Sequence, residues 1–89
     1  MSRRSNQKIW TTDDVLYLLT ELKTKMSFND WNEIQKQVAI ELNTTLGSVK
    51  ATFSNCRYIV TGVGLYHNTE AQVEATEMFV KKYGKSMFL

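Results

Sequence analysis

The sequence contains no proline, one cysteine, one histidine and only four glycines in 89 residues. Because proline is absent, no helix has to break at a residue that lacks a backbone N–H. A single cysteine excludes an internal disulfide and a thiolate zinc cage. No apolar run is long enough to span a membrane, and no signal-peptide pattern follows the start. We therefore expect an intracellular protein: cytoplasmic, at the nucleoid if prokaryotic or phage-borne, nuclear if eukaryotic.

The length and composition are those of one small globular domain. A chain of 89 residues is long enough for a single modest core. Hydrophobic residues make up 43% of it and charged residues 22%, which is a globular rather than a disordered composition.

The charges are unevenly distributed along the chain, although the net charge is only +2. Residues 1–8 hold Arg3, Arg4 and Lys8 and no acid, and residues 43–69 hold Lys50 and Arg57 and no acid. All nine carboxylates lie in residues 13–41 and 70–77. The two acid-free stretches can together form one positive face.

Apolar periodicity predicts four helices and no strand. Suitable N-caps precede the four helices: Thr11, Asn29 or Asp30, Thr45 and Thr69. The third helix should end at Gly62 and Gly64. Asp14 and Glu33 stand where a capping box needs an acid. The predicted spans are therefore about 12–26, 31–42, 46–61 and 69–82.

The predicted third helix has two different sides. Val49, Phe53, Cys56 and Val60 share one narrow stripe, which must face the core. The opposite side is small and polar. It consists of Gly47, Ala51, Ser54 and Tyr58, flanked by Lys50, Asn55 and Arg57.

Large aromatic residues recur once in each of the first three predicted helices, with 20 and 21 residues between Trp10, Trp31 and Phe53. Three short helices with a short link before the third match the helix-turn-helix plan. The motifs are "WTTDDV", "WNEI" and "VKATF". Residues 9–60 thereby resemble the Myb/SANT-like family, whose pattern runs W-T-x-E-E, W-x-x-I-A and V-K-x-x-W. The chain departs from it with Phe53 for the third tryptophan, Gln35 for a small residue, and Ala51 where base-reading members often carry a polar one.

The resemblance implies an all-α fold, a three-helix Myb/homeodomain-like helix-turn-helix bundle, here with an added C-terminal fourth helix. It also implies double-stranded DNA as the partner, with the third helix in the major groove. The expected contact residues are Gly47, Lys50, Ala51, Ser54 and Asn55. Lys50 is suited to guanine acceptors or to a phosphate, and Asn55 to adenine. We expect Arg57 and Tyr58 to meet phosphate, and Arg3 and Arg4 to help from a basic arm.

A second, weaker likeness covers residues 54–69, "SNCRYIVTGVGLYHNT". This segment is similar to the helix-to-loop stretch in N-terminal modules of some bacterial and phage nucleases. No nuclease motif follows it.

No residue pattern indicates an enzyme. His67 has no second ligand at zinc spacing, and Cys56 lies on the core stripe. The carboxylates form no convincing acid/base pair. We expect no catalytic residue, cofactor, metal, membrane or small-molecule substrate.

Two functions and two uses of the fourth helix stay open at this point. The chain is a small DNA-binding regulator or accessory factor, or it is a SANT-like protein-interaction module that does not bind DNA. The expected organisation is a flexible arm (1–8), a Myb-like domain (9–61), and a loop with a C-terminal helix (62–89). Helix 69–82 and the apolar tail either pack on the other helices or bind a second copy or a larger partner.

Overall fold

The computed structural model describes residues 9–28, 30–63 and 69–89 of the chain. These residues form an all-α fold, as predicted, and contain no strand. The four α-helices and a C-terminal 3-10 helix are α1 (Thr12–Lys25), α2 (Trp31–Glu41), α3 (Leu46–Thr61), α4 (Glu70–Tyr83) and η2 (Ser86–Phe88).

Three of the helices begin at a threonine whose hydroxyl accepts a backbone N–H three residues later. Thr11 accepts from Asp14, Thr45 from Ser48, and Thr69 from Gln72, all at 3.1–3.2 Å. In turn, the Asp14 side chain accepts the backbone N–H of Thr11, and the Gln72 side chain accepts that of Thr69. These reciprocal bonds complete two capping boxes. The predicted caps are thus confirmed.

The start of α2 differs from the prediction in one detail. Asp30 is the N-cap, and its carboxylate accepts the Asn32 N–H at 2.8 Å. Glu33 forms an ion pair with Lys36 at 3.7 Å rather than the expected capping box. Its side chain extends along the helix surface because Lys36 lies one turn further on.

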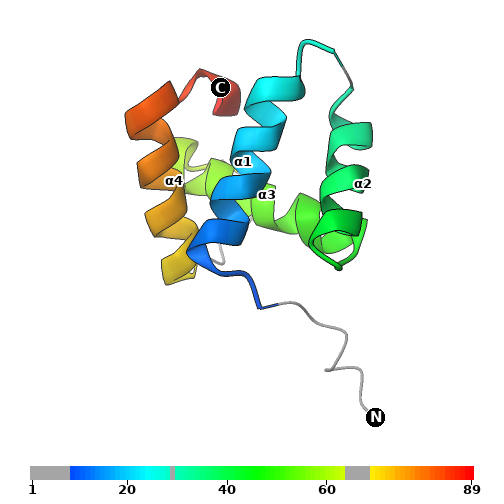
Figure 1. Ribbon diagram of the computed structural model, residues 1–89. Helices are drawn as coiled ribbons and strands as arrows, with labels where there is room; N and C mark the ends of the chain where they lie inside the picture. The colour runs from blue at the N-terminus through cyan, green and yellow to red at the C-terminus, as the bar shows by residue number, and fades with distance from the viewer. Residues whose placement is uncertain (1–8, 29, 64–68) are drawn as a thin grey trace.

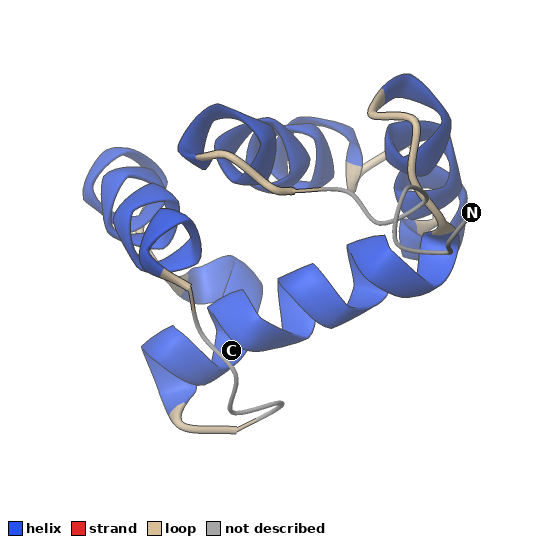
Figure 2. Ribbon diagram, turned by 90° about the horizontal axis from the view of Figure 1, so that it is seen from below, coloured by secondary structure: helices blue, strands red, loops and turns tan. Residues whose placement is uncertain are grey.

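Helix α1 lies between α4 and α2, and α3 runs across one side of all three (Figure 1). The view from below shows α3 passing under the other helices along much of its length (Figure 2). A residue on the far side of α3 therefore faces away from the rest of the molecule.

One hydrophobic core joins the four helices and η2. Helix α1 supplies its centre, because Val15, Leu18, Leu19 and Leu22 are fully buried. Ile34 of α2 is buried as well, and so is Val49 of the predicted core stripe on α3. The aromatics Trp10, Trp31 and Phe53 are only half-buried and pack against the margin of this core. Trp31 meets the edge of Phe53 at a centroid distance of 5.1 Å.

The C-terminal tail folds back onto the core. Phe88 is 2% exposed, stacks on Phe53 at 5.6 Å and meets Phe79 edge-on at 5.7 Å. Met87 is buried with it, whereas Leu89 is 79% exposed. Most of the apolar surface that suggested assembly through α4 and the tail is therefore covered within the chain. Binding of a second copy or a larger partner through α4 and the tail remains a prediction, and exposed apolar surface there no longer supports it.

Candidate nucleic-acid interface

The side of α3 that faces away from the other helices has the composition that the sequence predicted, except for Asn55. We call this surface the outer face of α3. Gly47, Lys50 and Arg57 are exposed on it, and Ala51, Ser54 and Tyr58 are half-buried. Thr45 starts the helix and Gly62, in the left-handed conformation at φ 79°, ends it. These local signals fix the length of the face at about four turns.

Asn55 is not on the outer face, so its predicted contact with adenine is wrong. Its side chain is 6% exposed. The amide oxygen is buried and has no hydrogen-bond partner among the described residues. An adenine base needs both ends of an amide in the groove, and a buried side chain presents neither.

The packing around α3 explains why Asn55 is buried. Seven residues before Asn55, on the same side of the helix, the Ser48 hydroxyl accepts the Trp10 indole N–H at 3.0 Å. The next residue, Cys56, faces Thr76 of α4. Helices α1, α2 and α4 all pack against α3. The buried arc thus runs through Thr52, Asn55 and Cys56.

The two cations of the outer face have no acidic partner in the described part of the chain. The ion pairs found there join Lys25 to Glu21 and Lys36 to Glu33. Helix α3 itself carries no acid. Lys50 and Arg57 thus leave an uncompensated positive charge on the outer face.

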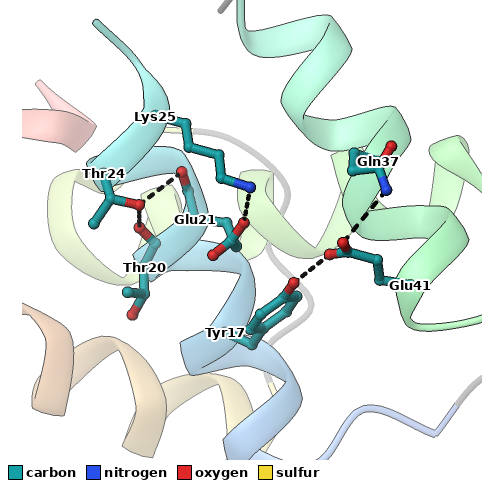
Figure 3. A network of polar contacts seen from close by, with 7 residues as sticks. All are labelled: Tyr17, Thr20, Glu21, Thr24, Lys25, Gln37 and Glu41. Atoms are coloured by element: carbon teal, nitrogen blue, oxygen red, sulfur yellow. Dashed lines mark hydrogen bonds and ion pairs between the residues drawn. The ribbon is translucent and has the colours of Figure 1, made fainter. Parts of the chain in front are cut away.

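The opposite arrangement is found between α1 and α2, where acids gather and are partnered (Figure 3). The Tyr17 hydroxyl donates to Glu41, and the Gln37 amide donates to the other oxygen of that carboxylate at 3.3 Å. This hydrogen bond raises the pKa of Tyr17 to about 12 and lowers the pKa of Glu41. Lys25 pairs with Glu21 at 2.6 Å, which raises the pKa of the lysine.

Arg57 also borders a shallow cleft that the sequence analysis missed. The cleft has a volume of about 130 Å³ and lies between the start of α2, the middle of α3 and the C-terminus. Its other lining residues are Trp31, Phe53, Met87, Phe88 and Leu89. The signal in the sequence was "GKSMFL", in which the turn residue Gly84 comes shortly before an apolar tail that returns to the core.

Several predicted features lie outside the described residues: Arg3 and Arg4 of the arm, Gly64, and His67. Cys56 is buried as predicted, and burial raises the pKa of its thiol to about 11, which disfavours the nucleophilic thiolate. Within residues 9–28, 30–63 and 69–89, no group of three His, Cys, Asp or Glu side chains is placed to hold a metal ion. None of the described helices combines the length and apolarity needed to cross a membrane.

Comparison of the chain with models of protein families, with curated protein sequences and with solved structures gives no match. The Myb/SANT-like resemblance therefore depends on the three aromatic motifs alone. Those motifs do lie near the starts of α1 and α2 and within α3.

Proposed function

We propose that this chain is a small, non-enzymatic protein that binds double-stranded DNA with the outer face of α3, as a regulator or accessory factor. The observation that carries the proposal is the isolated positive charge on that face. Lys50 and Arg57 are exposed there and are not paired with any described carboxylate. Phosphate oxygens supply the anionic partner that two such cations lack.

The shape of the face supports the same proposal. Gly47, Ala51 and Ser54 are small, so the helix backbone can approach a surface closely. The major groove of B-DNA is about 12 Å wide and admits an α-helix. In the Myb-like arrangement that we propose, α3 enters this groove, Tyr58 meets a phosphate, and Arg3 and Arg4 add contacts from the arm.

A SANT-like protein-interaction module remains the second candidate. Two large apolar side chains favour it, because Phe28 is 83% exposed and Ile40 is 71% exposed. They lie in the α1–α2 connection and on α2, away from the acid-free helix. A DNA-binding face on α3 leaves both of them available, so the two candidates can be separated by mutation.

The decisive experiment reverses charge on α3 and on a matched control surface. We expect the double variant Lys50→Glu, Arg57→Glu to bind mixed-sequence duplex DNA on the order of 100-fold more weakly, because each lost charge-assisted contact is worth about tenfold. The control Lys36→Glu, Lys81→Glu has the same net charge but changes exposed residues of α2 and α4. Fluorescence anisotropy at low salt measures both, and circular dichroism checks that both fold.

Two results would contradict the proposal. If the intact chain shows no affinity for duplex DNA at low salt, the protein-interaction candidate replaces it. If both double variants lose the same affinity, binding follows net charge and does not use the outer face of α3.

A further inference from the structure

The outer face of α3 carries few groups that can distinguish one base pair from another. The amide best suited to adenine, Asn55, is buried. Between Lys50 and Arg57 the face presents Ala51 and Ser54. A serine hydroxyl accepts or donates and so suits any base pair, and an alanine methyl offers only weak contact with thymine. The middle of the face therefore provides close approach rather than base discrimination.

The two cations stand at a separation that matches the groove. Lys50 and Arg57 are seven residues apart, which is nearly two full turns, so they project from the same side of α3. At 1.5 Å per residue their backbones are about 10.5 Å apart along the axis. The major groove between its two phosphate backbones is about 12 Å wide.

Arg57 lies at the lateral border of the outer face, beside the cleft. Its side chain lines the cleft that Trp31 and Phe88 form beside α3. Lys50 lies toward the other end of the helix, one turn after the exposed Gly47. Lys50 therefore lies in the N-terminal half of α3 and Arg57 in the C-terminal half, on either side of its central turns.

We infer that α3 crosses the major groove and that Lys50 and Arg57 each contact a phosphate, one on each strand. This inference depends on the proposed function and specifies its substrate: B-form duplex DNA, recognised by groove width and charge with little preference for sequence. Lys50 and Arg57 are then positioning residues that set affinity, and no side chain between them selects a base.

The test measures the intact chain against a set of short duplexes of equal length. We expect A·T-only, G·C-only and mixed DNA duplexes to bind with affinities within about threefold of one another. An RNA duplex and a single DNA strand should bind at least about tenfold more weakly, because the A-form major groove is deep and narrow and a single strand has no groove.

Single neutral variants separate phosphate contact from base contact. Lys50→Gln and Arg57→Gln should each weaken binding by a similar factor on all three DNA duplexes and reduce the slope of log affinity against log salt by about one. Lys36→Gln is the matched control and should leave the slope unchanged.

The outcomes distinguish this inference from the proposed function. If one DNA duplex is preferred more than about tenfold and the preference disappears in Lys50→Gln or Arg57→Gln, these residues read bases and the inference is wrong, although DNA binding stands. Equal affinity for the RNA duplex overturns recognition by groove width. If no duplex binds, the proposed function fails as well.

Discussion

The outer face of α3 and the surface between α1 and α2 differ in whether their charged side chains have partners within the chain. Between α1 and α2, Glu41 accepts from Tyr17 and Gln37, and Glu21 pairs with Lys25 (Figure 3). On α3, Lys50 and Arg57 have no described carboxylate as a partner. A surface whose charges are satisfied within the chain gains little from an outside ion. A surface whose charges are unsatisfied attracts one.

The two surfaces should also contribute to different properties, one to the stability of the fold and the other to binding. Exposed pairs within one helix or between neighbouring helices contribute little to stability, because water already screens them. The cations of α3 matter for association, since an anionic partner releases its counterions when it binds them. The comparison can therefore be tested by changing packing, then the charge of α3, then the pairing on α1 and α2.

The largest expected effect comes from removing the packing that holds α3 in its orientation. Phe88→Ala should lower the free energy of unfolding by about 3–5 kcal/mol, because it leaves a cavity against Phe53 and Phe79. Leu89→Ala is the neighbouring control and should change it by less than about 0.5 kcal/mol, because Leu89 is mostly exposed. Urea unfolding followed by circular dichroism measures both. Equal stability of the two variants would show that the tail does not pack on α3.

An acidic residue introduced on the outer face of α3 should compensate part of its positive charge, as the carboxylates between α1 and α2 do. Gly47 is exposed in the first turn, and a Cβ there would meet only the Thr45 hydroxyl at 3.9 Å. Gly47→Ala should stabilise the helix by about 0.5–1 kcal/mol. Gly47→Glu should give a similar gain, because an acid suits the helix N-terminus.

The two Gly47 variants should differ in binding although they agree in stability. We expect Gly47→Glu to weaken duplex binding by at least about tenfold, because the carboxylate would oppose phosphate, whereas Gly47→Ala retains affinity. Thermal melting and anisotropy titration give the two quantities for each protein. Retention of full affinity by Gly47→Glu would exclude the start of α3 from the interface.

The smallest effect concerns the pairing between α1 and α2. Since the raised pKa of Tyr17 comes first from its hydrogen bond to Glu41, Glu41→Gln should return that pKa from about 12 toward 10. Glu33→Gln is the control, because Glu33 pairs with Lys36 instead. Ultraviolet absorbance of the phenolate follows the titration, and Tyr17→Phe assigns it among the four tyrosines. An unchanged titration in Glu41→Gln would contradict the observed pairing.

The signs of the two shifted pKa values set the pH range of this pairing. Tyr17 is raised, so its contribution to stability is complete below its ordinary pKa and is lost as the pH rises through about 12. Glu41 is lowered, so its contribution is present above its ordinary pKa and is lost as the pH falls through the lowered value. The pairing is therefore intact around neutral pH.

Sequence reasoning succeeded where the interaction is local. Thr11, Thr45 and Thr69 were recognised as caps because each bonds a backbone group three residues away. It was incomplete for the large aromatics, because their regular spacing along the chain did not show that Trp10, Trp31 and Phe53 lie at the margin of the core.

The amino-acid sequence by itself determined the four helices, their ends, the uneven distribution of charge and the acid-free character of α3. Each of these depends on residues within one or two turns of each other, or on composition alone. Only the tertiary structure decided how far burial on α3 extends beyond the predicted core stripe. That extent depends on elements distant in sequence from Asn55, among them α4, which packs on α3. A helical wheel assumes one buried stripe, whereas α3 is covered from more than one side, and so Asn55 became part of the interior.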